Sequence, residues 1–346
     1  MSRKKFIYYI KMNLSKKIFI TGGAGYVGSR LVPFFLENGY EVCVYDIMYF
    51  GSEHLKEHKN LSLIEGDIRD IKKIESSCKD FDIFLHLACI SNDSSFELNE
   101  ELSKTINYDC FEPMVCAAKK SGIKRFIYAS SSSVYGVSEE KDVKEEHKLV
   151  PLTLYNKFKG MCEPLLFKHT DKNFTGVIFR PATVYGCSNR MRFDLSVNIL
   201  TNHAIKNKKI LVFGGSQLRP NLHIEDYCEA VKLLIESDEK KIENEIFNVG
   251  YQNLSILEIA EKVKKIVEDK FEDIENIEIE LQTSNDIRSY HINSDKIYDK
   301  LGFKPQKTIE YGIGEICDAF KNGLFQDSFE NINYYNLKKL KQLDVK

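Results

Sequence analysis

A tyrosine and a lysine four positions apart form the residue pair with the clearest chemistry in this sequence. Tyr155 and Lys159 lie in a helix-like segment, so their side chains are expected on one helix face. A neighbouring ammonium stabilises a phenolate and lowers the tyrosine pKa from about 10 towards neutrality. We therefore expect Tyr155 to act as a base, with the hydroxyl of Ser131 bonded to the same substrate oxygen.

The spacing alone is weak evidence, because it recurs near the C-terminus. Tyr334 with Lys338 and Tyr335 with Lys339 share it, in a polar tail without strands around it. Tyr155 differs through its context. Ser131 follows a strand-like run, and a serine at the carboxyl edge of a parallel sheet points into the crevice where ligands bind.

A glycine-rich turn near the N-terminus predicts a dinucleotide site. The run TGGAGYVG, residues 21–28, follows a strand-like segment and precedes an amphipathic helix. Two glycines allow a tight turn and close approach of the backbone, the last one lets helix and sheet pack, and a pyrophosphate rests on the helix N-terminus. The residues expected at the cofactor from this turn are Gly22, Gly25, Tyr26, Val27 and Gly28.

A carboxylate after the second strand-like run indicates which dinucleotide is bound. Asp46 can accept hydrogen bonds from both ribose hydroxyls of the adenosine half and would repel a 2′-phosphate. Residues 47–50 offer no arginine to attract such a phosphate. NAD therefore fits better than NADP. Asp67 and Ile68, after the third run, are expected at the adenine edge.

These residues are positioned by alternating strand-like and helix-like segments, a pattern that predicts an α/β fold with a Rossmann-type doubly wound parallel sheet. The strand-like runs are 18–20, 42–45, 61–64, 83–87, 125–130 and 177–180, and the helix-like ones are 25–38, 101–121 and 155–170. After Gly186 the rhythm changes to irregular segments, a strand at 210–213 and helices at 225–235 and after the capping box Ser255–Glu258. This half predicts a smaller, interleaved C-terminal substrate lobe.

The predicted organisation has four parts. Residues 1–17 are a leader, expected to be disordered, and residues 18–186 are the NAD-binding domain, to which segments near 222–262 return. Residues 187–221 and 263–330 form the substrate lobe, and 331–346 form a tail.

Composition narrows the class of protein. The 346 residues are 43% hydrophobic, with a net charge of -2, so a sizeable core is possible and no field favours nucleic acid or an anionic membrane. Nine scattered cysteines without a C-x-x-C pair favour reduced thiols over a disulfide frame or a zinc site. His86 and His223 lack spaced ligand partners and are expected to be packed. No apolar stretch approaches bilayer length. We expect a cytoplasmic enzyme without a metal.

In combination, the motifs resemble the extended short-chain dehydrogenase/reductases that modify nucleotide sugars, the group that contains UDP-galactose 4-epimerase. The similarity covers residues 18 to about 320. It rests on the glycine turn, Asp46, GDIR at 66–69, HLA at 86–88, Asn107, SSSSVYG at 130–136, the Tyr155 and Lys159 pair, and RPATVYG at 180–186.

The resemblance implies roles for these residues. Ser131, Tyr155 and Lys159 would form the catalytic triad, and Asn107 would be a structural or proton-relay residue. The residues implied beside the cofactor and sugar are Leu87, Ala88, Pro181 and Thr183. It also implies NAD as cofactor, a nucleotide-diphosphate sugar as substrate, and a homodimer formed by two-helix packing.

The two residues after Ser131 bear on the reaction that the resemblance implies, hydride transfer from sugar carbon 4 to NAD. Similar 4,6-dehydratases have an Asp-Glu pair there, decarboxylating relatives a Glu at the second position, and 3,5-epimerases a Cys. This chain has Ser132 and Ser133, and neutral hydroxyls are poor acids and bases. An NDP-sugar 4-epimerase or an NDP-hexose or NDP-heptose 4-dehydrogenase is favoured, with a 4,6-dehydratase as alternative.

Candidate phosphate ligands are arginines. Arg219 resembles the family arginine that clamps phosphate, although Pro220 replaces its usual Asp neighbour, and Arg288 lies near a second family arginine without clean register. Two guanidinium groups, each able to donate two parallel hydrogen bonds, would suit a diphosphate. Thr183 stands where relatives commonly have an Asn that touches the sugar diphosphate. The patch at 190–192 either touches phosphate or is solvated.

Two further functions stay open at this point. A non-catalytic NAD-binding regulator of the same fold would be expected to have a broken triad, and this one is complete. A steroid- or flavonoid-type reductase would be expected to prefer NADP and an apolar pocket, which Asp46 and the arginines oppose.

Overall fold

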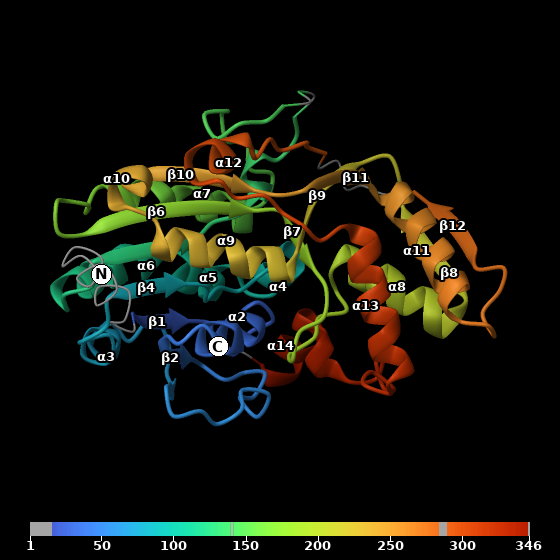
Figure 1. Ribbon diagram of the computed structural model, residues 1–346, viewed down its shortest axis with the longest axis horizontal. Helices are drawn as coiled ribbons and strands as arrows, with labels where there is room; N and C mark the ends of the chain where they lie inside the picture. The colour runs from blue at the N-terminus through green and yellow to red at the C-terminus, as the bar shows by residue number, and fades with distance from the viewer. Residues whose placement is uncertain (1–15, 139, 141, 284–288, 345–346) are drawn as a thin grey trace, which may run out of the picture.

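A computed structural model describes residues 16–138, 140, 142–283 and 289–344 of the chain (Figure 1). Its centre is a seven-stranded sheet in the order β10-β6-β5-β4-β1-β2-β3, with every neighbouring pair parallel. The strands are β1 Lys17–Thr21, β2 Glu41–Asp46, β3 Leu61–Glu65, β4 Ile83–His86, β5 Arg125–Ala129, β6 Thr175–Pro181 and β10 Glu245–Val249. The predicted parallel α/β fold is confirmed, and β10 adds a strand that the sequence pattern did not predict.

Helices cover both faces of this sheet, as a doubly wound fold requires. On one face, α2 (Gly28–Glu37) packs against α9 (Ile224–Glu236) over an aliphatic core. On the other, α3 (Ile71–Ser77), α6 (Phe111–Lys120) and α7 (Leu154–Phe167) bury an aromatic-rich core. The strand order reverses between β1 and β4, which is the switch point where such sheets bind ligands at their carboxyl edge.

A second cluster lies at one end of the sheet (Figure 1). Its helices α8 (Ser196–Asn207), α11 (Ile256–Lys270) and α13 (Ile309–Lys321) pack on β8 (Lys209–Phe213), which pairs with β12 (Glu278–Gln282). The predicted capping box is present, since Ser255 and Glu258 bond each other's backbone N–H groups at the start of α11.

Some elements pack differently from the predicted division of the chain. Within the stretch 222–262, β10 joins the central sheet and α9 packs on that sheet. By contrast, α11 packs in the second cluster. Conversely, α12 (Asp295–Leu301) packs on β10. The predicted leader falls almost wholly on residues 1–15, which lie outside the described residues, and Lys17 already belongs to β1.

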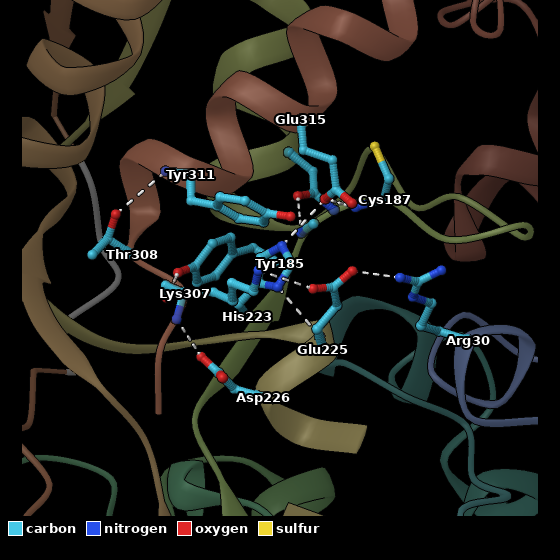
Figure 2. A network of polar contacts seen from close by, with 12 residues as sticks. Arg30, Tyr185, Cys187, His223, Glu225, Asp226, Lys307, Thr308, Tyr311 and Glu315 are labelled. Atoms are coloured by element: carbon cyan, nitrogen blue, oxygen red, sulfur yellow. Dashed lines mark hydrogen bonds and ion pairs between the residues drawn. The ribbon is translucent and has the colours of Figure 1, made fainter. Parts of the chain in front are cut away.

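A short three-stranded sheet connects the two parts, with β9 (Leu218–His223) between β7 (Thr183–Tyr185) and β11 (Gln252–Ser255). Figure 2 shows a polar network at this junction. Glu225 binds Arg30 of α2 and, at 3.5 Å, Lys307 from the segment before α13. The fully buried His223 lies 3.2 Å from a carboxylate oxygen of Glu315 on α13. These ion pairs fix the substrate side of the molecule relative to α2 of the nucleotide side.

The C-terminal region, predicted only as a tail, contains two short helical elements. A 3-10 turn at Ile332–Tyr334 leads into α14 (Asn336–Leu343), which packs beside α4 (Asp93–Phe96). Tyr334 lies edge-on to the rings of Phe193 and Phe325. We call residues 335–343 the C-terminal strap, because they lie against the nucleotide side of the molecule.

Among the described residues, no helix is long and apolar enough to cross a membrane.

Candidate active site

One cavity of about 610 Å³ lies at the carboxyl edge of the central sheet. It is lined by every predicted site residue that the structure describes: Gly22, Gly25, Tyr26, Val27, Gly28, Asp46, Asp67, Ile68, Leu87, Ala88, Ser131, Ser132, Ser133, Tyr155, Lys159, Pro181, Thr183 and Arg219. Arg288 lies outside the described residues. The sheet therefore brings together groups that are far apart in the sequence.

The glycine turn presents bare backbone to this cavity. Gly22 has a φ of +79°, and a Cβ there would lie 2.6 Å from the backbone nitrogen of Ala88 on the neighbouring loop. A Cβ on Gly28 would collide with Gly23. Helix α2 begins at Gly28, so its positive N-terminal end lies beside the cavity that Gly22, Gly25 and Gly28 line. Bare backbone at a helix N-terminus is the kind of site that binds phosphate groups.

Asp46 closes the ribose end of the cofactor side. Its carboxylate accepts the backbone N–H of Ala24 at 3.0 Å and that of Met48 at 2.9 Å, which fixes its orientation. Burial raises the pKa of Asp46, and these two hydrogen bonds oppose that shift. Although residues 47–50 contain no arginine, Arg190 lies on the ring of Phe50, 3.6 Å from its centroid. The local sequence around Asp46 therefore did not indicate the nearby cation Arg190, and the selection of NAD by Asp46 stays a prediction.

The reacting groups lie on the opposite wall. Ser131 follows β5 and caps a 3-10 turn, and its Oγ lies 2.7 Å from the Oγ of Ser133. The Ser133 hydroxyl in turn donates to the side-chain oxygen of Asn156. Tyr155 lies in the first turn of α7 and lines the cavity, while Lys159 Nζ donates to the carbonyl of Ala129 at 2.7 Å. The side chains of Ser131, Ser133 and Asn156 thus form a chain of hydrogen bonds between uncharged groups.

The electrostatics of Tyr155 differ from the sequence-based expectation. Burial raises the pKa of its phenol well above the usual value, Cys89 and Asp93 add to the rise, and Arg192 opposes it. Lys159 was expected to lower this pKa, but its ammonium is directed to a backbone carbonyl. The raised pKa keeps Tyr155 a neutral phenol at neutral pH in the protein alone. Bound NAD would bring a positive nicotinamide ring, which favours the phenolate.

A buried ion pair stabilises the elements that carry Ser131 and Tyr155. Arg180 of β6 binds Glu163 of α7 at 2.6 Å, with both side chains at most 4% exposed. Glu163 also accepts the hydroxyl of Ser130 at 2.7 Å, and Arg180 donates to the hydroxyl of Tyr135 at 2.6 Å. Removing one partner of such a pair leaves an uncompensated buried charge. The pair holds β5, β6 and α7 together and so fixes the spacing of Ser131 and Tyr155.

Asn107 has a structural use in this arrangement. Its side-chain oxygen accepts the N–H of Ile90 at 2.8 Å, and its amide nitrogen donates to the carbonyl of Ile90 at 2.9 Å. Both polar atoms are committed to the loop after β4, which lines the cavity. Of the two implied roles, the structural one matches these contacts.

The substrate side contains residues that sequence reasoning did not assign. Thr183 and Arg219 come from the neighbouring strands β7 and β9. The unassigned residues that line the same cavity include Cys89, Ser91, Asp93, Arg190, Arg192, Asp194, Asn336 and Leu340. The basic patch at 190–192 was a usable signal for two of them. Asn336 and Leu340 had none, because nothing in a polar tail indicates what it packs against. No group of three or more potential metal ligands occurs in the described part of the chain.

Fold and cavity together define an NAD-binding enzyme of the extended short-chain dehydrogenase/reductase type. The model described as "NAD dependent epimerase/dehydratase family" matches residues 18–250. The chain belongs to this family, and NAD is its cofactor.

Individual relatives are more distant. The low-salt glycan biosynthesis protein Agl12 of Haloferax volcanii is 27% identical over 88% of this chain and 98% of its own length. The dTDP-D-glucose 4,6-dehydratase of Mus musculus is 27% identical over 89% of this chain and 90% of its own. The structure of a UDP-glucose 4-epimerase from Thermotoga maritima with UDP-glucose has a TM-score of 0.78 at 25% identity, covering 89% of this chain and 99% of that one. These relatives include both an epimerase and a dehydratase.

Proposed function

We propose that this protein oxidises carbon 4 of a nucleotide-diphosphate sugar, as a 4-epimerase or as a 4-dehydrogenase acting on a hexose or heptose. The observation that carries the proposal is the shared wall of Ser131, Tyr155 and Lys159, followed by two neutral serines. The resemblance of the fold to a UDP-glucose 4-epimerase solved with UDP-glucose supports the substrate class.

Each side chain has a defined part in this reaction. Tyr155 takes the proton from the 4-hydroxyl of the sugar, and Ser131 donates a hydrogen bond to the same oxygen as charge develops on it. Lys159, held by the carbonyl of Ala129, keeps a positive charge on this wall. When bound, NAD supplies the hydride acceptor and the positive ring that favours the phenolate. Arg219 is suited to the diphosphate of the sugar nucleotide.

The serines after Ser131 bear on the fate of the 4-keto sugar. Loss of water across carbons 5 and 6 requires a base and an acid at those carbons. Ser132 is 1% exposed, and Ser133 is held between Ser131 and Asn156. Neither offers a carboxyl group, so we expect carbon 6 to stay intact.

A 4,6-dehydratase is the second candidate, because one carboxyl group lies near the base. Asp93 lines the cavity, acts on the pKa of Tyr155, and accepts the hydroxyl of Thr153 at 2.6 Å. Asp93 is the first residue of α4 and does not occupy the position beside Ser131. Asp93 is the group that would have to supply the missing acid or base.

Product analysis in deuterated water tests the proposal. The protein is incubated with NAD and a panel of UDP, GDP and dTDP sugars, and the products are examined by NMR. A 4-epimer without solvent deuterium identifies an epimerase, and a 4-keto sugar identifies a dehydrogenase. A 6-deoxy-4-keto product with deuterium on carbon 6 would refute the proposal, and its loss in Asp93→Asn would assign the dehydratase chemistry to that carboxyl group.

A further inference from the structure

Two buried arginines line the cavity without a role in the chemistry above. Arg190 and Arg192 lie on the segment between β7 and α8 and are 5% and 7% exposed. Among the described residues, Nε of Arg190 and one terminal nitrogen of Arg192 are buried without a hydrogen-bond partner. Buried donors on charged groups are costly unless a partner satisfies them. Their placement suits a ligand that brings acceptor oxygens.

A closed ring of hydrogen bonds holds the two guanidinium groups. Asn336 of the strap accepts from Arg190 at 2.6 Å and donates to the hydroxyl of Ser91 at 2.7 Å. The same hydroxyl accepts from Arg192 at 3.3 Å. Arg192 and the backbone N–H of Asn336 both bond to the carboxylate of Asp194, at 2.8 Å and 2.9 Å. The loop after β4, the segment after β7 and the strap therefore meet at this pair.

The charges in this ring do not balance. Asp194 forms an ion pair with Arg192, whereas no ion pair of Arg190 occurs among the described residues. The ring of Phe50 faces Arg190, and a cation over an aromatic ring is only partly compensated. Burial and the nearby Arg192 lower the pKa of Arg190 to about 9. A bound anion would supply the missing negative charge.

The neighbours of the pair indicate which part of a ligand would reach it. The charge of Arg190 acts on Asp46 at the ribose end, and that of Arg192 acts on Tyr26 of the glycine turn and on Tyr155. The pair thus lies between the cofactor side and the reacting wall. We propose that Arg190 and Arg192 bind the diphosphate group of a nucleotide, and that Asn336 positions Arg190. The inference deepens the proposed function, because the nucleotide is either NAD or the sugar nucleotide.

Calorimetry on Arg190→Met and Arg192→Met separates the two sources. Each protein is titrated with NAD and with UDP, GDP and dTDP. A loss of at least tenfold in NAD affinity places the cofactor diphosphate at the pair, and a similar loss for a nucleoside diphosphate that the unmodified protein binds places the substrate there. Unchanged affinity for NAD and for every diphosphate that the unmodified protein binds would overturn the proposal. Calorimetry measures binding without turnover. A product assay that refuted the proposed function would therefore leave this proposal about nucleotide binding intact.

Thermal unfolding distinguishes a binding role from a structural one. A binding role predicts that Arg190→Met leaves the Tm of the ligand-free protein unchanged or raised, because an unpaired buried charge is removed, while the rise in Tm caused by the nucleotide shrinks. A lower ligand-free Tm with an undiminished rise on binding would contradict the proposal. Arg125→Met is the matched control, since Arg125 is also buried but lies outside the cavity and bonds to the backbone carbonyls of Leu234 and Ser237. Its ligand-free Tm should fall, and the rise in Tm on nucleotide binding should stay the same.

The part of Asn336 is tested in a double-mutant cycle. If Asn336 acts by positioning Arg190, Asn336→Ala should weaken nucleotide binding several-fold in the unmodified protein and have no further effect in Arg190→Met. Equal losses in both backgrounds would show that Asn336 does not act through Arg190.

Discussion

The two sides of the cavity are built differently. The cofactor side consists of residues that directly follow β1, β2, β3 and β4, so the parallel sheet itself places the glycine turn, Asp46, Asp67 and Leu87. The substrate side combines Thr183, Arg219 and the strap, which reach the cavity from elements with no common periodicity. A site made at strand ends can be recognised from local sequence, whereas a site made by long-range packing cannot. Substitutions on the cofactor side and on the substrate side test whether the two sides have separate functions.

Tyr155→Phe should have the largest effect, because it removes the base at the boundary between the two sides and keeps the ring. Turnover should fall by on the order of 10²-fold or more, while NAD affinity measured by calorimetry stays the same. Tyr334→Phe is the control, since Tyr334 packs through its ring against Phe193 and should lose no activity. Unimpaired turnover of Tyr155→Phe would place the chemistry elsewhere.

Arg219→Ala should affect the substrate side alone. Loss of a charge-assisted fork should weaken binding of the sugar nucleotide by roughly 2 kcal/mol, about 30-fold, with NAD affinity unchanged. Titration calorimetry with each ligand measures both values. If sugar-nucleotide affinity were unaltered, Arg219 would be a residue of the lobe surface rather than a ligand.

The pH dependence should follow the phenol of Tyr155. Burial raises its pKa, so the phenolate is the minor form at neutral pH and its fraction grows as pH rises. We expect kcat/KM to increase up to about tenfold per pH unit below that pKa. A kcat/KM that falls as pH rises from about 7 to about 9 would exclude Tyr155 as the titrating base.

Asp46→Ala should have the smallest of these effects and should affect the cofactor side alone. NAD should bind the unmodified protein at least about tenfold more tightly than NADP, because the carboxylate meets the ribose hydroxyls and repels a phosphate. The substitution should narrow this gap, and the neighbouring Arg190 would favour the phosphate once the carboxylate is gone. Equal affinities of the unmodified protein for NAD and NADP would remove the basis for assigning the selection of NAD to Asp46.

The fold was predictable where local pattern and tertiary structure agree. Runs rich in apolar residues marked β1 to β6, because strands buried on both faces must be apolar throughout. The edge strand β3 is the exception, since it is partly exposed. β10 was missed, since Glu245–Val249 follows a charged stretch and forms a strand only by pairing with β6. The strap was missed for a similar reason, because Asn336 and Leu340 are the buried residues of a short, lysine-rich helix.

The site was predictable to a comparable extent. Ser131, Tyr155 and Lys159 could be assigned because family motifs fix their order, and the sheet brings them to one cavity. The direction of the pKa shift of Tyr155 could not be predicted from sequence. It depends on burial and on Cys89, Asp93 and Arg192, which come from other elements. The cation beside Asp46 also came from a distant segment, which no local motif around Asp46 indicates.

Transfer of a label from carbon 4 tests the central claim most directly. The sugar nucleotide identified by product analysis is prepared with deuterium on carbon 4. The reaction is quenched within the first turnover with alkali, in which reduced nicotinamide is stable, before mass spectrometry of the cofactor. We predict that the reduced cofactor carries one deuterium with the unmodified protein and that almost none forms with Tyr155→Phe. Reduced cofactor without deuterium, with the label retained on the sugar, would contradict oxidation at carbon 4.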